Sequence, residues 1–282
     1  MRNSLGADTT RSVATRKDWL DRPHASHWGA HGDRSTPPAV ILAAGQGSRL
    51  GGRDDLPKPL TELLGLSLLE RTIRTAHAAG VRRFVVVTGH RQHEVATATA
   101  SMAARLGVRI DVAESRSWEL GNGASALASE PHIDGRFFLL MADHLYPADF
   151  LARLIEHDDG VRTCALVVDH DLPAVYDLPE ATKVRIAGSE IIAIGKALSD
   201  FDAADTGIFL CRPALFDALR DCATHGRHLL GEAVQLLAAR GEVSWVPSAG
   251  QLWQDVDTPE DLAVARGRLL AVSNDERLLS RP

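Results

Sequence analysis

Two glycines and two cations near the start of the chain have the types and spacing that bind phosphate. Gly45 and Gly47 follow a short apolar run at residues 39–44, and Arg49 and Lys58 come next. The glycines let backbone N–H groups approach an anion closely, and the cations supply the positive charge that a triphosphate requires. The spacing matches neither a P-loop nor a dinucleotide fingerprint. The segment therefore predicts a phosphate-binding loop, with a plain glycine-rich turn as the alternative.

Three acidic residues are candidates for holding a metal ion beside that loop. Asp143 follows a second apolar run, and hard cations such as Mg²⁺ prefer oxygen ligands that they share with phosphates. The alternative roles for Asp143 are a helix cap or an ion pair with Arg49 or Lys58. Asp255 and Asp257 are two residues apart, so they point the same way if the segment is extended. We expect one of them to complete the metal site and the other to be a candidate helix cap.

An amide side chain between two glycines is the candidate for reading a nucleobase. Gly121, Asn122 and Gly123 stand at the start of a predicted helix. An asparagine side chain both donates and accepts hydrogen bonds, as the edge of a base does. A helix cap is the compatible alternative.

Two lysines in the second half of the chain are candidates for a second phosphate. Lys183 and Lys196 stand on the two arms of a predicted hairpin, where they either face solvent or face inward toward an anion. No Gly-x-Ser-x-Gly elbow or Cys/His pair marks a covalent nucleophile. The candidate residues thus favour chemistry on phosphates without a covalent intermediate.

The elements that position these residues predict an α/β fold with a mostly parallel central sheet and helices on both faces. Apolar strands alternate with helices in the first half, which is typical of a parallel sheet. The predicted strands are 39–43, 83–88, 108–113 and 136–141, and the predicted helices lie near 67–79, 91–106 and 123–130. In such sheets a ligand lies beyond the carboxyl ends of the strands, where the phosphate-binding loop and Asp143 stand.

The second half of the chain does not continue the regular alternation of strands and helices. Residues 184–194 predict a hairpin that turns at Gly188-Ser189, and we expect it to form a small lid over an acceptor pocket. A last helix is expected to begin at Thr258, with a threonine cap and a proline in its first turn. The other predicted elements are helices near 147–157, 213–222 and 228–240, and strands near 162–168, 205–211 and 242–247.

Composition and charge limit the class of protein. Residues 1–37 carry a formal charge of +2 and the rest of the chain −8, which argues against a nucleic-acid surface. Three cysteines without metal-ligand spacing read as free buried thiols of a cytoplasmic protein. No run has the ~20 apolar residues of a membrane span, so no membrane insertion is expected. We predict a flexible extension at 1–37, one domain at 38–272 and a tail at 273–282.

The chain from about 38 to 270 resembles the nucleotidyltransferases of the GT-A-like sugar-nucleotide pyrophosphorylase superfamily. Within it, the inositol-1-phosphate cytidylyltransferases are the most similar group. General motifs are Leu42-Ala-Ala-Gly-Gln-Gly-Ser-Arg49 and Pro57-Lys-Pro-Leu60. More specific ones are Gly121-Asn-Gly123, Met141-Ala-Asp-His-Leu-Tyr146, Glu180-Ala-Thr-Lys183, Ile194-Gly-Lys196, Phe201-Asp-Ala-Ala-Asp-Thr-Gly207 and Leu252-Trp-Gln-Asp-Val-Asp-Thr258.

The resemblance implies a role for each matching residue. Arg49 and Lys58 would be the catalytic cations, with Lys58 stabilising charge at the α-phosphate of CTP. Asp143 would bind Mg²⁺ together with Asp257, or with Asp255 as in many sugar-nucleotide members. The nucleotide would contact Ala43, Ala44, Gly45, Gln46, Gly47, Ser48, Arg49, Lys58, Gly121, Asn122 and Gly123. The acceptor would contact Glu180, Lys183, Lys196 and Asp205.

The resemblance also implies a reaction. The chain would transfer CMP from CTP to inositol 1-phosphate or a similar cyclitol phosphate, and a separate membrane transferase would use the product. A homodimer is left open. The alternatives are a nucleotidyltransferase acting on valienol phosphate, a sugar 1-phosphate or phosphocholine, a GT-A glycosyltransferase, and a catalytically silent homologue. A glycosyltransferase normally needs Asp-x-Asp at the end of the central strand, where this chain has Ala142-Asp-His.

Overall fold

The computed structural model describes residues 36–50 and 56–279. Nearly all of the expected N-terminal extension, residues 1–37, lies outside these ranges. None of the helices in the described ranges has the length and apolar character that crossing a membrane requires. The three cysteines, which all lie within them, are buried free thiols, as expected.

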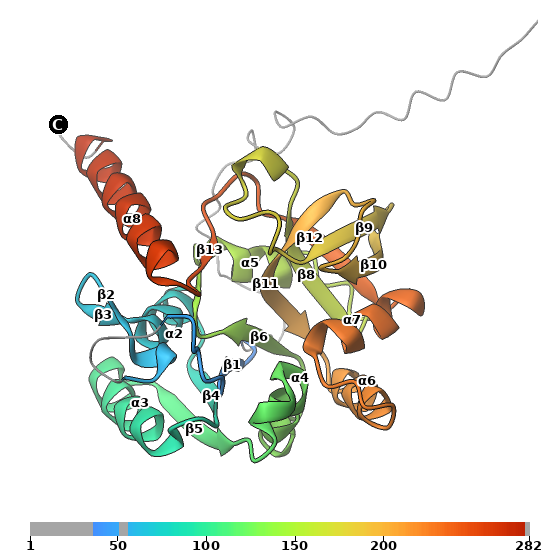
Figure 1. The fold of residues 1–282 in the computed structure, drawn as a ribbon, viewed down its shortest axis with the longest axis horizontal. Helices are drawn as coiled ribbons and strands as arrows, with labels where there is room; N and C mark the ends of the chain where they lie inside the picture. The colour runs from blue at the N-terminus through green and yellow to red at the C-terminus, as the bar shows by residue number, and fades with distance from the viewer. Residues whose placement is uncertain (1–35, 51–55, 280–282) are drawn as a thin grey trace, which may run out of the picture. The chain divides into compact units, whose positions relative to one another are not determined.

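A nine-stranded sheet in the order β5-β4-β1-β6-β11-β8-β12-β10-β9 organises the chain (Figure 1). Its first four strands are parallel to one another, which confirms the pattern expected for this half of the chain. These strands are β1 (Ala39–Ala43), β4 (Arg83–Thr88), β5 (Arg109–Glu114) and β6 (Phe137–Met141). Because β1 and β6 are parallel neighbours, the loops after them leave the same edge of the sheet.

The second half of the sheet is mixed rather than parallel. Its strands are β8 (Cys164–Asp169), β9 (Lys183–Ala187), β10 (Glu190–Gly195), β11 (Ala203–Cys211) and β12 (Val243–Pro247). Strand β11 runs antiparallel to both β6 and β8, while β8 and β12 are parallel. The β9–β10 hairpin turns where expected. It continues the main sheet instead of forming a separate lid, and β9 also pairs with β11, which closes a ring of five strands.

Two short ladders lie outside the main sheet. One pairs β2 (Glu62–Leu63) with β3 (Leu66–Ser67), and the other pairs β7 (His144–Leu145) with β13 (Gln254–Asp255). The second ladder joins the segment after β6 to the segment before the last helix. Two acidic candidates far apart in the sequence are thereby brought near each other.

Helices cover both faces of the sheet, as predicted (Figure 1). One face packs against α2 (Leu68–Ala78), α3 (Gln92–Leu106) and α5 (Asp149–Glu156), and the other against α4 (Asn122–Ala126), α6 (Ala214–Ala223) and α7 (Leu230–Ala239). The short 3-10 helices are η1 (Lys58–Leu60), η2 (Trp118–Leu120), η3 (Leu127–His132) and η4 (Leu172–Ala174). The last helix, α8 (Pro259–Leu279), contains the boundary expected at residue 272.

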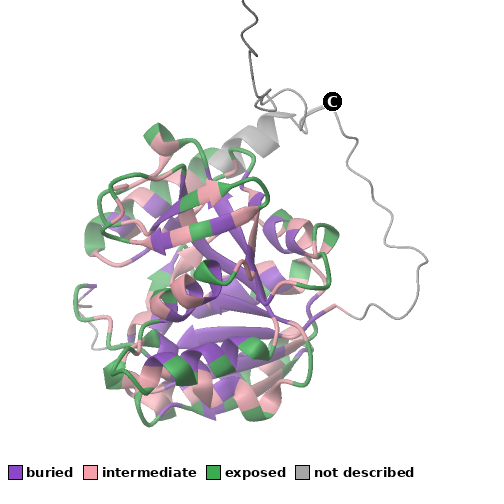
Figure 2. Cartoon of the chain, turned by 90° about the vertical axis from the view of Figure 1, so that its right-hand side faces the viewer, coloured by how far each residue is buried: buried purple, intermediate pink, exposed green. Residues whose placement is uncertain are grey.

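The apolar strand β1 is buried on both faces. Ile41 belongs to the hydrophobic cluster under α2, α3 and α5, whereas Val40 and Leu42 belong to the cluster under α4, α6 and α7. Figure 2 shows the buried strands inside and the exposed residues on the outer helix faces. Burial on both faces explains why the strand reads as a continuous apolar run rather than an alternating one.

Candidate functional site

The loop after β1 is shaped around Lys58. Gly47 has a φ of +61°, and a Cβ added there would lie 2.3 Å from the Cβ of Lys58. Lys58 begins η1 between two prolines, which fix the backbone direction of this turn. The glycine is therefore needed both for the left-handed backbone and for the passage of the lysine side chain.

The ammonium group of Lys58 lies between two carboxylates from distant parts of the chain. Its Nζ donates to Asp143 Oδ2 at 2.5 Å and also to Asp257 Oδ1. Arg49 donates to the other oxygen of Asp257 at 2.6 Å. The side chain of Lys58 is only 10% exposed, whereas that of Arg49 is 60% exposed. The structure thus brings together four of the residues that the sequence singled out for phosphate and metal binding.

Local hydrogen bonds fix the positions of the two acids. The N–H of Val256 donates to the carbonyl of Asp143 at 3.0 Å, which ties the two acid-bearing segments together. Asp261 accepts from the N–H groups of Asp257 and Thr258, and the Thr258 hydroxyl accepts from the N–H of Asp261. This reciprocal cap starts α8 at the threonine that the sequence predicted, and it also holds the backbone of Asp257.

The charges in this cluster reinforce one another. Burial opposes the charged form of Lys58, but Asp143 and Asp257 outweigh it and raise the pKa of Lys58. Burial likewise acts against the Asp143 carboxylate, yet Lys58 and His144 hold the pKa of Asp143 well below its usual range. Both groups are therefore charged at neutral pH.

The structure places the two candidate second acids differently. Asp257 shares Lys58 with Asp143, while Asp255 lies on β13 opposite His144 of β7. Burial raises the pKa of Asp255, His144 lowers it in part, and the charges of Asp257 and Asp143 add to the increase. The donor set of Asp143 and Asp257 suits a hard cation, since one ammonium group already lies within hydrogen-bond distance of both carboxylates.

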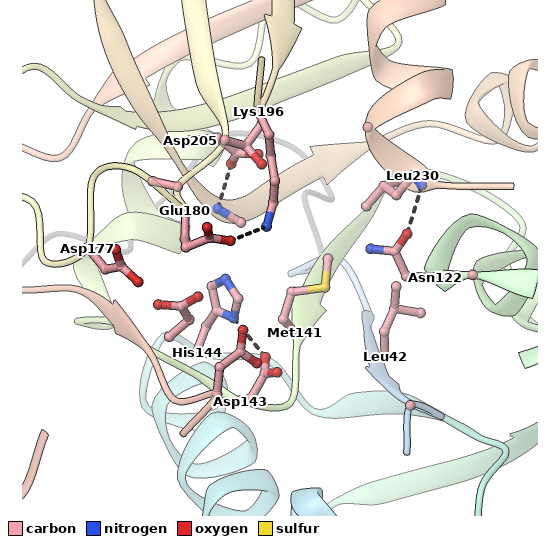
Figure 3. Close-up of a pocket in the computed structure, with 18 of the residues that line it drawn as sticks. Leu42, Asn122, Met141, Asp143, His144, Asp177, Glu180, Lys196, Asp205 and Leu230 are labelled. Atoms are coloured by element: carbon pink, nitrogen blue, oxygen red, sulfur yellow. Dashed lines mark hydrogen bonds and ion pairs between the residues drawn. The ribbon is translucent and has the colours of Figure 1, made fainter. Parts of the chain in front are cut away.

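His144 is a site residue that the sequence analysis did not select. Its Nδ1 lies 2.8 Å from Asp143 Oδ1 (Figure 3). Gly207 has a φ of +75°, and a Cβ there would lie 2.6 Å from His144 Nε2, so this glycine makes room for the imidazole. The available signals were a histidine directly after Asp143 and a glycine inside the strand β11.

The local role of Asn122 differs from the helix cap that was the alternative to recognition of a base. It is the first residue of α4, and its Oδ1 accepts from the N–H of Leu230 at the start of α7 (Figure 3). A Cβ at Gly121 or Gly123 would lie within 2.8 Å of the His228 carbonyl, so both glycines admit the chain before α7. Gly121 and Asn122 line the larger of two adjoining cavities that are described below, whereas Gly123 is buried outside the lining of this cavity.

Trp118 is a second residue that the sequence analysis missed. It lines the cavity beside Gly121, and its ring contacts His90 edge-on with centroids 5.3 Å apart. A Cβ at Gly89 would lie 2.6 Å from the Cβ of Trp118, so the glycine after β4 permits this approach. The sequence signal for it was an aromatic residue three positions before Gly121.

Three of the four expected acceptor residues line the larger cavity. Lys196 lies 3.7 Å from Glu180, and Figure 3 places both with Asp205 across the cavity from Asp143. Asp205 accepts from the N–H of Gly207 at 2.6 Å. Burial raises the pKa of Asp205 to about 6, although this hydrogen bond and His144 act in the opposite direction.

Lys183 does not follow the expectation that it faces an anion. It is buried and outside the cavity lining, and its Nζ donates to the carbonyls of Pro179 at 2.6 Å and Lys196 at 3.2 Å. The side chain is enclosed at the start of β9, so its ammonium group donates to backbone carbonyls instead of to water. In this structure Lys183 supports the loop that carries Glu180.

Two adjoining cavities contain most of the selected residues. The larger has a volume of about 490 Å³ and the smaller about 280 Å³. Both are lined by Leu42, Gly45, Arg49, Asp143 and Asp257. The smaller also includes Ala43, Gly47, Ser48 and Lys58, and the larger includes Ala44 and Asp255. A ligand can therefore extend from the phosphate loop toward Lys196.

The sequence is similar to known transferases. Residues 39–238 match the family described as the MobA-like NTP transferase domain. A bifunctional IPC transferase and DIPP synthase from Rubrobacter xylanophilus is 40% identical over 86% of this chain and 55% of its own length. The protein of the same name from Archaeoglobus fulgidus is 33% identical over 83% and 44%. The chain thus spans about half the length of these relatives.

Two solved structures are similar in fold. The inositol-1-phosphate CTP transferase from T. maritima has a TM-score of 0.71 and 28% identity, with 80% of this chain and 91% of that chain covered. A putative glucose-1-phosphate thymidylyltransferase from Bacillus anthracis also has a TM-score of 0.71, at 17% identity, with coverages of 82% and 94%. The second likeness concerns the fold alone.

Proposed function

The chain belongs to the MobA-like NTP transferase domain family, and we propose that it transfers CMP from CTP to inositol 1-phosphate or a similar cyclitol phosphate. An oxygen of the acceptor phosphate attacks the α-phosphorus of CTP. The bond from that phosphorus to the bridging oxygen breaks, and pyrophosphate leaves. The names of the similar IPC transferases and of the T. maritima CTP transferase support this choice of substrates.

The observation that carries the proposal is the convergence of two cations and two acids where the two cavities meet. Arg49, Lys58, Asp143 and Asp257 come from four separate segments, and ion pairs connect them. The phosphate loop lies on one side of this cluster, and Lys196 lies on the cavity wall beyond it. Such an arrangement suits a reaction that must join two phosphate groups.

The acceptor phosphate is an anion at neutral pH, so the reaction needs no general base. The work of the protein is to align two polyanions and to offset the charge that develops on the α-phosphate and on the leaving pyrophosphate. Lys58 would contact the α-phosphate, and Arg49 with the loop N–H groups would hold the remaining phosphates. The position of Lys58 beside both acids supports this role.

Asp143 and Asp257 are the residues that would hold Mg²⁺. Their shared contact with one ammonium group supports this pairing over Asp143 with Asp255, which lacks that contact. When bound, the ion would supply positive charge to the triphosphate. His144 would keep the Asp143 carboxylate oriented through its Nδ1.

The amide of Asn122 would present its NH₂ group to the base. Its oxygen already accepts from Leu230, which leaves the donor side for a ligand in the cavity. A donor in this position suits an acceptor atom such as O2 or N3 of cytosine. Trp118 would offer an aromatic surface beside it.

The acceptor would occupy the part of the cavity near Lys196. That ammonium group would bind the acceptor phosphate, while Glu180 and Asp205 would accept hydrogen bonds from ring hydroxyls. Lys183 would act indirectly, through the loop that it supports. The free thiols are consistent with the predicted cytoplasmic location, and a separate enzyme would consume the nucleotide-activated product.

A pyrophosphate-release screen tests the proposal. It crosses ATP, CTP, GTP and UTP with inositol 1-phosphate, glucose 1-phosphate, phosphocholine and a valienol phosphate, with and without Mg²⁺. We expect release with CTP and inositol 1-phosphate, dependent on Mg²⁺. Release with another pair would keep the reaction class but overturn the substrates. No release with any pair would overturn the proposed function itself.

A further inference from the structure

We infer that Asp169 is a positioning residue that fixes two walls of the active site at once. One wall is the segment 248–257, which carries Asp257, and the other is the loop 171–182, which carries Glu180. The inference rests on the proposed function for the meaning of these walls. The hydrogen bonds that Asp169 makes are present in the structure and do not depend on the proposed function.

Asp169 is a buried carboxylate surrounded by donors. It is the last residue of β8 and is 6% exposed. One oxygen accepts from the Ser248 hydroxyl at 2.9 Å and from the N–H of Asp171 at 3.1 Å. The other oxygen accepts from the indole N–H of Trp253 at 2.7 Å. Three partners from two segments thus share one side chain.

The contacts to Ser248 and Trp253 fasten the first wall at two points. Ser248 directly follows β12, and its N–H also donates to the carbonyl of Val168. Trp253 lines the larger cavity and precedes the short strand β13 that carries Asp255. Because Asp257 is four residues beyond Trp253, a fixed indole limits where this metal-binding candidate can lie.

The contact to Asp171 fastens the second wall at its start. Asp171 lies at the start of the loop that continues through η4. This loop contributes Tyr176, Asp177 and Glu180 to the cavity lining. Lys183 holds the far end of the same loop through the carbonyl of Pro179. The loop is therefore anchored at both ends by buried polar side chains.

The hydrogen-bond donors around position 169 require a carboxylate side chain. The indole N–H and the backbone N–H can only donate, and they contact different oxygens of Asp169. An asparagine would turn its NH₂ group toward one of these donors in either orientation. Asp169→Asn therefore keeps the size of the side chain but breaks one of the two anchors.

Four variants of the full chain test the inference: Asp169→Asn, Trp253→Phe, the double variant, and the control Thr163→Val. The control breaks a partly buried side-chain bond from Thr163 to Glu242 at the opposite end of the same strand pair. Metal affinity is measured with Mn²⁺ by electron paramagnetic resonance of the free ion. The indole is followed by ¹⁹F NMR of 5-fluorotryptophan protein, in which Trp253→Phe identifies one of the five tryptophan signals.

We expect Asp169→Asn to shift or broaden the Trp253 signal and to weaken Mn²⁺ binding about 10-fold, as loss of a residue that orients metal ligands does. Turnover should show a higher KM for the acceptor. The double variant should lose less Mn²⁺ affinity than the product of the two single effects, because both changes act on the contact between residues 169 and 253. Thr163→Val should leave the signal and the affinity close to wild type.

Two outcomes would overturn the inference. Either Asp169→Asn leaves the Trp253 signal and Mn²⁺ affinity unchanged, or Thr163→Val disturbs both as strongly. Failure of the proposed function is separate, since a wild-type protein without pyrophosphate release would still show whether Asp169 holds the indole.

Discussion

At the residue scale, the central feature is a lysine held between two carboxylates. Lys58 is enclosed and contacts both Asp143 and Asp257, while Arg49 contacts Asp257 from an exposed position. An enclosed charge interacts more strongly with its neighbours than an exposed one, because water screens it less. Lys58 is therefore better placed than Arg49 to act on charge that develops during the reaction.

Lys58→Met should reduce turnover far more than nucleotide binding. The contact to the α-phosphate would strengthen in the transition state, so we expect kcat to fall on the order of 100- to 1,000-fold. The Kd for CTP should rise less than about 10-fold. Stopped assays of pyrophosphate release give kcat, and equilibrium dialysis gives Kd. Equal losses in both constants would contradict the assigned role.

Gly47→Ala should destabilise the unliganded protein. The added Cβ overlaps the Lys58 side chain, and the φ of +61° strains any residue other than glycine. We expect a loss of about 1–3 kcal/mol in the free energy of unfolding, measured in urea. Gly45→Ala is the matched control for stability, since its Cβ meets no atom within 4 Å. Similar losses in both variants would show that crowding against Lys58 is not the cause.

Asp205→Asn should stabilise the protein at neutral pH. Burial raises the pKa of Asp205 from 3.8 to about 6, so the folded state favours the protonated acid. The resulting penalty is absent below pH 4, grows between pH 4 and 6, and is complete above that range. The variant should therefore gain roughly 1–3 kcal/mol at pH 8 and nothing at pH 4. Urea unfolding at both pH values measures this difference, and an equal gain at both would refute the assignment.

At the element scale, the site depends on how the strand ends and one helix start are joined. The β7–β13 ladder brings the segment after β6 next to the segment before α8. The cap of α8 then fixes the backbone of Asp257 through Asp261. The sequence predicted the Thr258 cap. The cap also positions Asp257, and this matters for the site because the β7–β13 ladder brings that segment next to Asp143.

Thr258→Ala should weaken metal binding as well as stability. Loss of the hydroxyl removes the bond from the N–H of Asp261, at a cost of about 1 kcal/mol. Because Asp261 also holds Asp257, we expect the Mg²⁺ concentration for half-maximal activity to rise. Ser67→Ala is the control, since Ser67 caps α2 through Glu70 without contacting a site acid. If both variants change the Mg²⁺ requirement alike, the link from the cap to Asp257 is wrong.

At the scale of the whole molecule, one groove connects the two halves of the sheet. The loop after β1 belongs to the parallel half. Asp205 lies on β11 in the ring of five strands, and Lys196 directly follows β10 of the same ring. Both halves line the larger cavity. A nucleotide bound along it would contact both halves of the sheet and should stabilise the domain as a unit.

CTP with Mg²⁺ should therefore raise the melting temperature. At 100 times its Kd, a ligand that binds only the folded state adds about 2.7 kcal/mol. For a domain of this size that corresponds to roughly 5–10 °C. Thermal unfolding with equal concentrations of GTP is the control. An equal shift with GTP would remove the preference for cytosine from the proposal.

The sequence by itself determined the fold class, most of the elements and the identity of the four charged residues that meet, Arg49, Lys58, Asp143 and Asp257. Periodicity and glycine positions are local properties, so β1, its loop and the Thr258 cap follow from neighbouring residues. The helix expected near 123–130 instead divides into α4 and η3, which contains Pro131. A proline lacks the N–H that a regular helix would use at this point.

Only the tertiary structure decided which side chains meet. Lys183 was expected to face either solvent or an anion but is enclosed by carbonyls. Asn122 was a candidate for reading a base or for a local cap, and its side chain accepts from the N–H at the start of α7. His144, Trp118 and Asp169 gained their positions from contacts between strands far apart in the chain. Such contacts depend on strand order and on the antiparallel insertion of β11, which no local pattern encodes.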